Sequence, residues 1–269
     1  MSSRKLKVNI AGLSVLLEVD TREGYMMLEE WLEDYKNDTD PDFTLHFFHE
    51  EERFKLGFEG NLQGSSDEII QMSVKMGHID YQNRYAMGPD AAMINKELAR
   101  FLFSNSLRIV VQYVLPKFGG VLIHASAVAD NGKSYVFIGP NDGGKTTIAQ
   151  NTGKVILSDD CIGLNRFEGG WNACATPWGN IHNYGLYPIS GIFFISKSDR
   201  LESARVDKLS AVKKLFSNIC TSFPSSQEHA SEILENVLSI LEQVCGEIPA
   251  CNLWFRKDDN VFDEIKRCA

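Results

Sequence analysis

A glycine-rich run in the middle of the chain, GPNDGGKTT, has the residue types and the spacing of a loop that binds phosphate. It fits the pattern of glycine, four residues, glycine, lysine, then serine or threonine. The glycines let the backbone turn its N–H groups inward around an anion, and the lysine can reach the terminal phosphates. The run consists of Gly139, Pro140, Asn141, Asp142, Gly143, Gly144, Lys145, Thr146 and Thr147.

The flanks of this run are those that the pattern requires. Residues 134–138 are apolar and favour a strand, residues 146–151 favour a short helix, and Gly153 suits the position after a helix end. The start of that helix favours an anion, and the Thr146 hydroxyl can join the coordination of Mg²⁺. The sequence therefore predicts nucleotide binding; the alternative is a glycine-rich turn that only ends a strand.

Two adjacent carboxylates follow the next strand expected along the chain, at residues 155–158. Asp159 and Asp160 lie 14 and 15 residues after Lys145, which leaves room for a short helix and one strand. Their like charges repel each other, and burial raises the cost unless a cation lies between them. The pair predicts a Mg²⁺ site beside the phosphate loop, and the alternative is a solvated turn.

A hairpin is expected just before the phosphate loop. Residues 121–128 are typical of a strand and contain His124, and Asp130, Asn131 and Gly132 give a two-residue turn signal. The residues alone leave two roles open for His124: a hydrogen-bonded core residue or a catalytic group.

Composition narrows the function classes. The chain has 269 residues, 43% of them hydrophobic, and a net charge of −9, which argues against broad nucleic-acid binding. No apolar run approaches the length of a membrane span and the N-terminus lacks a signal-peptide core, so we expect a cytoplasmic protein without membrane contact. The six cysteines form no Cys-x-x-Cys pair, so we expect neither a zinc site nor a disulfide.

The N-terminal third differs from the rest in its pattern of apolar residues. Residues 6–19 suggest a strand pair around Gly12, residues 23–35 a helix, and residues 43–48, 54–58 and 69–74 short strands. Apolar residues at helical intervals then predict a long helix over residues 91–115. We therefore expect a mostly β domain at residues 1–90 and a second domain at residues 91–269.

The C-terminal part carries weaker signals. The aromatic residues Trp178, Tyr184 and Tyr187 suit a substrate cleft or the edge of a core, and Lys197 suits either a phosphate contact or a solvated surface, which we favour. Helices are expected at residues 209–216 and 230–244, and strands at 191–196 and 252–256. A tail helix at residues 262–267 is expected to pack on the sheet or to mediate a homo-oligomer.

Three segments in this order resemble the kinase domain of the HPr kinase/phosphorylase family: GVLIHA at residues 120–125, the phosphate loop, and LSDD at residues 157–160. The similarity covers residues 115–200, approximately. That family shares its P-loop core with phosphoenolpyruvate carboxykinase. The resemblance implies an α+β or α/β fold, in which the second domain is an HPr-kinase-like mixed sheet with flanking helices.

The same resemblance implies a reaction and residue roles. The γ-phosphoryl group of ATP would pass, with Mg²⁺, to a serine hydroxyl of a protein, a peptide or free serine. Lys145 and Thr146 would hold the phosphates and the metal, Asp159 would accept the hydroxyl proton, His124 would lie beside that aspartate, and Asp160 would hold or orient the metal. Phosphoryl transfer requires mainly positioning and charge neutralisation, which this set supplies.

Residues 180–187 depart from the family pattern because they contain neither Glu nor Arg. The resemblance therefore does not extend to the reverse phosphorylase reaction or to HPr as the acceptor. A nucleotide-binding regulatory module without phosphoryl transfer is the alternative. A carboxykinase-like metabolic enzyme is disfavoured, because the chain is short and has no second evident anion-binding cluster.

Overall fold

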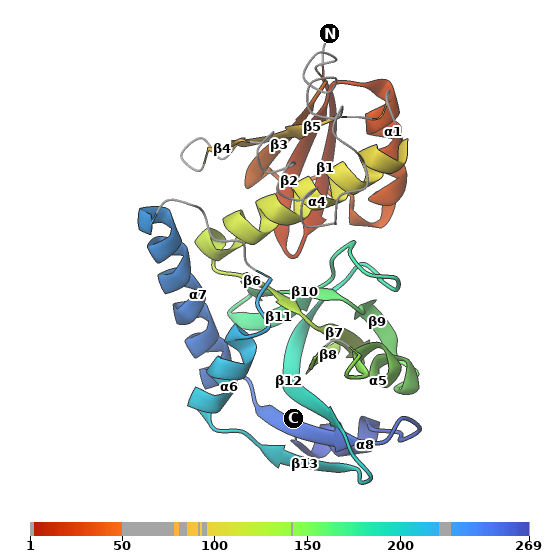
Figure 1. Cartoon of the computed structure of the whole chain (residues 1–269), viewed down its shortest axis with the longest axis vertical. Helices are drawn as coiled ribbons and strands as arrows, with labels where there is room; N and C mark the ends of the chain where they lie inside the picture. Colours follow the sequence, from red (N-terminus) through yellow and green to blue (C-terminus); the bar gives the residue numbers. More distant parts are fainter. Residues whose placement is uncertain are drawn as a thin grey trace, which may run out of the picture. The chain divides into compact units, whose positions relative to one another are not determined.

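The computed structural model describes residues 3–49, 78–80, 85–90, 92, 96–140, 142–220 and 227–268. The chain divides into two compact units, one made of Met1–Asn9 and Leu13–Val114 and the other of Ile10–Gly12 and Leu115–Ala269. Each unit contains a mixed sheet with flanking helices (Figure 1), so the expectation of a mixed α and β fold is confirmed.

The sheet of the first unit has the strand order β1-β2-β3-β5-β4. Strands β2, β3 and β5 are parallel, and β4 is antiparallel to β5. The expected strand pair around Gly12 is confirmed as β1 and β2, and the expected strands at residues 54–58 and 69–74 lie outside the described residues. The elements are β1 (Arg4–Ile10), β2 (Leu13–Val19), α1 (Arg22–Trp31), η1 (Glu33–Tyr35), β3 (Phe43–Phe48), β4 (His78–Asp80), β5 (Tyr85–Pro89) and α4 (Lys96–Val114).

Helix α4 belongs to the first unit, whereas the sequence predicts a domain boundary between residues 90 and 91. Its buried side chains recur every three or four residues, and the helix packs on β3 and β5. The ring of Phe103 meets the ring of Phe47 on β3 edge-on, with the centroids 4.8 Å apart. Helical periodicity indicates that a face is buried, but not which sheet buries it.

The second unit is built on nine strands in the order β6-β10-β11-β12-β8-β7-β9, and β14 pairs with both β12 and β13. The strand expected at residues 121–128 is instead two strands that break at Ala125: β6 pairs with β10, and β7 pairs with β8 and β9. The elements are η2 (Leu115–Phe118), β6 (Val121–His124), β7 (Ser126–Asp130), β8 (Lys133–Ile138), α5 (Lys145–Asn151), β9 (Val155–Ser158), β10 (Cys161–Phe167), β11 (Gly170–Cys174), β12 (Leu186–Lys197), β13 (Glu202–Arg205), α6 (Lys208–Phe216), α7 (Gln227–Glu247), β14 (Ala250–Phe255) and α8 (Phe262–Cys268).

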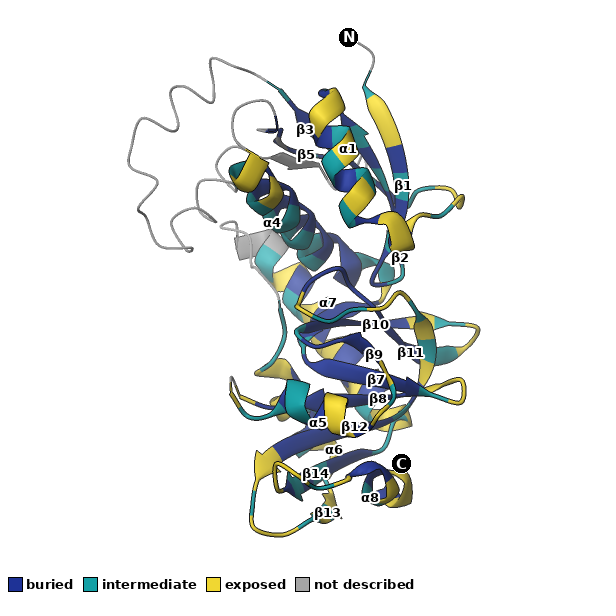
Figure 2. Ribbon diagram, turned by 90° about the vertical axis from the view of Figure 1, so that its right-hand side faces the viewer, coloured by how far each residue is buried: buried dark blue, intermediate teal, exposed yellow. Residues whose placement is uncertain are grey.

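The expected hairpin before the phosphate loop is confirmed. Strands β7 and β8 pair antiparallel up to Asp130 and Lys133, and the two turn residues, Asn131 and Gly132, have φ angles of 50° and 75°. Both angles are of the sign that a tight two-residue hairpin needs. Figure 2 shows β7 and β8 buried over most of their length.

Strand direction gathers several chain ends at one edge of this sheet. Strands β8 and β9 are both antiparallel to β7, so they run the same way, and β12 is parallel to β8. The carboxyl ends of β8, β9 and β12 therefore lie at the edge where β7 begins. The phosphate loop, the aspartate pair and Lys197 all follow or end these strands.

Helices cover both faces of this sheet. Phe137, Phe193 and Ile195 point to the face on which α5 and α8 contribute to a common apolar cluster. Phe194 alternates with its neighbours and points the other way, where the ammonium of Lys214 on α6 lies 5.0 Å from its ring centroid. Helix α6 in turn packs against α7.

The structure corrects the expectation that the chain has no disulfide. Cys251 on β14 and Cys268 on α8 are joined by a disulfide, with their α-carbons 6.7 Å apart. The bond ties the C-terminal helix to the sheet. Packing on the sheet is one of the two roles that the sequence analysis expects for this helix. Cys161, Cys174, Cys220 and Cys245 are not part of a disulfide.

Within the described residues, none of the helices has the length and apolar character needed to cross a membrane.

Candidate functional site

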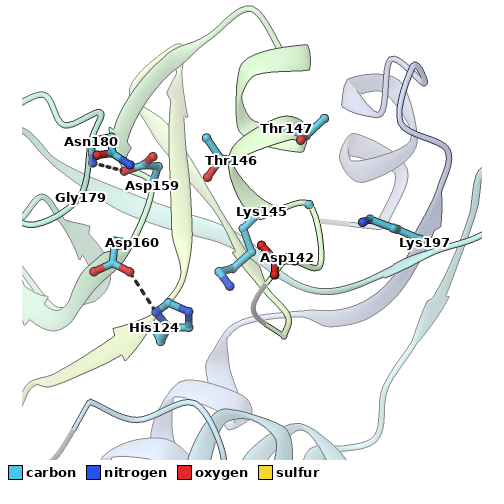
Figure 3. A pocket seen from close by; sticks show the side chains of 11 residues that line it. His124, Asp142, Lys145, Thr146, Thr147, Asp159, Asp160, Gly179, Asn180 and Lys197 are labelled. Atoms are coloured by element: carbon cyan, nitrogen blue, oxygen red, sulfur yellow. Dashed lines mark hydrogen bonds and ion pairs between the residues drawn. The ribbon is translucent and has the colours of Figure 1, made fainter. Parts of the chain in front are cut away.

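A cavity of about 560 Å³ opens at the sheet edge where β8, β9 and β12 end (Figure 3). It brings together Lys145, the aspartate pair and His124, which the sequence predicts to share a site. The lining residues are His124, Asp142, Gly144, Lys145, Thr146, Thr147, Asp159, Asp160, Gly179, Asn180 and Lys197.

The loop between β8 and α5 turns back sharply on itself. The N–H of Gly143 donates to the Pro140 carbonyl at 3.0 Å, and Asp142 and Gly144 have φ angles of 58° and 97°. Gly139, Pro140 and Gly143 shape this loop without lining the cavity, and Asn141 lies outside the described residues.

Two of the glycines are required by close packing. A β-carbon on Gly139 would lie 2.7 Å from a side-chain carbon of Ile195, and one on Gly144 would lie 2.9 Å from the ring of Phe255. Gly144 also has the positive φ angle that residues with side chains adopt at a cost. Larger residues at these positions would push the loop away from the sheet.

Lys145 begins α5 and is 7% exposed. Its ammonium donates to the carbonyls of Gly139 at 3.0 Å and Pro140 at 3.1 Å, so both contacts are to neutral groups. Burial lowers the pKa of Lys145 below its ordinary value of 10.5, and the carboxylates of Asp160 and Asp142 act in the opposite direction. A buried ammonium whose hydrogen bonds go to neutral carbonyls is stabilised when an anion binds beside it.

Asp159 is held by backbone groups from a distant loop. Its Oδ1 accepts hydrogen bonds from the N–H groups of Asn180 at 2.9 Å and Ile181 at 3.1 Å, and its own N–H donates to the Ile181 carbonyl. The side chain is buried, and Oδ2 has no hydrogen-bond partner within the described part of the chain. This geometry fixes the carboxylate and leaves one oxygen for a ligand or a proton.

Asp160 is paired with His124 across the sheet. Register sets Cys161 of β10 opposite His124 of β6, so Asp160 lies next to the imidazole. The His124 Nδ1 is 3.3 Å from the Asp160 Oδ1, and this interaction raises the pKa of His124 above its ordinary value of 6.5. The family resemblance implies that His124 lies beside Asp159, whereas the contact that the structure records is with Asp160.

Each of the two aspartates has a partner of its own in this arrangement. Backbone N–H groups stabilise Asp159, and His124 stabilises Asp160. Among the described residues, no group of three or more His, Cys, Asp or Glu side chains is placed to hold a metal. Asp160 and the Thr146 hydroxyl are among the oxygen groups of the cavity lining that suit Mg²⁺, which commonly takes its remaining ligands from water and substrate phosphates.

Three lining residues were not among the predicted site residues. Gly179 and Asn180 come from the loop before β12, and Lys197 comes from the end of β12, where the sequence favours a solvated role. Lys197 lies here because β12 pairs parallel to β8, so both strands end at the same edge; this pairing is a feature of the structure that the sequence does not mark. Trp178, Tyr184 and Tyr187 do not line the cavity.

No protein-family model matches this sequence, and no curated protein matches it at a significant level.

Proposed function

We propose that the chain is an ATP- and Mg²⁺-dependent kinase that transfers the γ-phosphoryl group to a serine hydroxyl of a protein, a peptide or free serine. One observation carries this proposal: a glycine-rich loop with a buried lysine shares a cavity with a fixed carboxylate and a His–Asp pair. Each of these groups has a role in phosphoryl transfer, in which positioning and charge neutralisation supply most of the rate.

Lys145 and the loop residues bind the phosphate chain in this proposal. The recorded hydrogen bonds of the Lys145 ammonium within the described residues go to carbonyl oxygens, so a phosphate oxygen can enter as its charged partner. The hydroxyls of Thr146 and Thr147 line the same cavity and can donate to phosphate oxygens.

Asp160 and Thr146 are the residues that would hold Mg²⁺. Both offer oxygen ligands, and a site with few protein ligands suits an ion that reaches the protein together with phosphate. When bound, the ion neutralises charge on the phosphates. The Nδ1 of His124 keeps the Asp160 carboxylate oriented towards the cavity from one side.

Asp159 takes the proton of the acceptor hydroxyl. The serine oxygen forms a bond to the γ-phosphorus as the bond between that phosphorus and the β,γ-bridging oxygen breaks, and ADP leaves. The proton passes to Oδ2 of Asp159, because Oδ1 is occupied by two N–H donors. The backbone bonds keep this carboxylate in place without a second side chain.

The order of elements supports the likeness to the HPr-kinase core. The β7–β8 hairpin leads directly into the phosphate loop. Strand β9, which precedes the aspartates, lies two positions away from β8, with β7 between them. The second unit would then be an HPr-kinase-like domain. The lack of Glu and Arg at residues 180–187 favours the alternative, a module that binds nucleotide without transfer.

Transfer from γ-labelled ATP to serine-containing acceptors, with and without Mg²⁺, tests this proposal. The wild-type chain should label an acceptor only with Mg²⁺, and Asp159→Asn should lower the rate at least 100-fold while nucleotide binding persists. Asp258→Asn removes an exposed carboxylate outside the cavity and serves as the matched control. Full transfer by Asp159→Asn would show that Asp159 is not the proton acceptor, and ATP binding without any labelled product would favour the alternative.

A further inference from the structure

Lys197 is the last residue of β12, and strand geometry directs it to the phosphate loop. Phe193 and Ile195 point to the face of the sheet that carries α5, and Lys197 follows them at the same two-residue interval. Its Cε lies 3.8 Å from the position that a β-carbon on Gly144 would occupy. The side chain therefore passes over the point where the loop becomes the helix.

The charge of Lys197 is not neutralised within the part of the chain that the structure describes. The residue is exposed, and no ion pair or side-chain hydrogen bond of its ammonium is recorded there. Lys145, the other lysine of the cavity, contacts two carbonyls. The cavity thus contains two ammonium groups without a carboxylate in direct contact, an arrangement suited to a ligand with several negative charges.

The lining groups follow an order along the cavity that gives a phosphate chain a direction (Figure 3). His124 and the aspartate pair lie at one end, Lys145 and Thr146 lie between, and Lys197 lies at the opposite end. Transfer at Asp159 requires the γ-phosphate at the aspartate end. The α-phosphate then falls at the end where Lys197 lies.

We propose that Lys197 binds the α-phosphate of the nucleotide and so fixes its direction, with the nucleoside beyond Lys197 and the transferable phosphate at Asp159. This inference rests on the proposed function. Lysine suits the role because its flexible stem carries a compact charge to an exposed phosphate oxygen. Lys197 is a binding and positioning residue here and takes no part in proton transfer.

The dissociation constants of Mg-ATP, Mg-ADP and inorganic pyrophosphate, measured by calorimetry, test this assignment. Lys197→Gln should weaken ATP and ADP to a similar extent, about tenfold, and leave pyrophosphate binding at Lys145 unchanged. Lys197→Arg keeps the charge and should stay within about threefold of the wild type. Lys133→Gln removes an exposed lysine of the β7–β8 hairpin and is the matched control.

Each result decides between the two proposals. Wild-type affinity in Lys197→Gln overturns the role of Lys197 and leaves nucleotide binding intact. A loss of affinity for ATP but not for ADP would assign Lys197 to the γ-phosphate. An equal loss of affinity for pyrophosphate would show that Lys197 attracts anions non-specifically. Either result overturns the proposed direction. If the wild-type chain binds none of the three ligands, the proposed function fails, and this assignment fails with it.

Discussion

Gly179 lies directly against the carboxylate of Asp159. Its φ angle is 110°, and a β-carbon built on it would overlap with Oδ1 of Asp159, the oxygen that accepts two backbone hydrogen bonds. The absence of a side chain at residue 179 is thus what lets the loop before β12 hold the carboxylate that follows β9.

Gly179→Ala should therefore disturb the site more than it disturbs the fold. The added methyl group forces either Asp159 or the N–H groups of Asn180 and Ile181 to move, so we expect transfer to fall at least tenfold. Because alanine adopts a positive φ angle at a cost, the substitution should also lower the free energy of unfolding by about 1–2 kcal/mol. Transfer rates and urea unfolding measure the two effects separately.

Gly169→Ala is the matched control for this substitution. Gly169 also has a positive φ angle, 82°, but a β-carbon there meets no atom within 4 Å. It should lose a similar free energy of unfolding and keep full activity. Equal activities in the two variants would show that contact with Gly179 does not position Asp159.

Asp130 should give the fold a dependence on acid pH. Its carboxylate forms ion pairs with Lys154 at 2.9 Å and Lys266 at 3.3 Å, and these ion pairs hold the pKa of Asp130 below the ordinary value of 3.8. A carboxylate with a lowered pKa in the folded state stabilises the fold above the unfolded pKa, and this contribution is lost as the pH falls through the folded pKa.

The wild type should accordingly exceed Asp130→Asn in free energy of unfolding at pH 6, and the difference should shrink as the pH falls below 3.8. Urea unfolding of both chains from pH 6 to pH 3 measures it. A difference that stays constant over this range would contradict the role given to these ion pairs.

The Cys251–Cys268 disulfide should contribute measurably to stability. It closes a loop of 17 residues, for which the loss of chain entropy in the unfolded state corresponds to about 3 kcal/mol. Cys268→Ala should therefore lower the free energy of unfolding by about that amount. Cys245→Ala, which removes a free thiol from α7, should cost less than about 1 kcal/mol.

Alkylation of the unreduced, unfolded chain followed by mass measurement checks the bond itself. Four of the six cysteines should react before reduction and all six after it. Reaction of all six without reduction, or equal stability losses in the two variants, would be inconsistent with the disulfide.

The sequence was most informative where function and local geometry depend on adjacent residues. The turn at Asn131 and Gly132, the phosphate loop with its helix, and the strand that precedes Asp159 each follow from a few neighbouring residue types. Their meeting at one sheet edge could be predicted only in part, because it depends on β7 lying between β8 and β9.

Contacts between distant segments could not be predicted. The break at Ala125 arises because its N–H donates to the carbonyl of Asp160 rather than continuing one strand. The hydrogen bonds from Asn180 and Ile181 to Asp159 join residues 21 and 22 positions apart, and no periodic pattern marks them. The hairpin of β10 and β11 was not predicted, because its strands are largely buried and lack a clear alternation of apolar and polar residues.

The measurement that tests the central claim most directly is the affinity for ATP in the presence and absence of Mg²⁺. The wild-type chain should bind Mg-ATP with saturation, and Lys145→Gln should weaken this binding at least tenfold because a charged partner of the phosphates is lost. Lys133→Gln should bind as the wild type does. No binding by the wild type at millimolar Mg-ATP, or equal affinity in Lys145→Gln, would contradict a phosphate site at this loop.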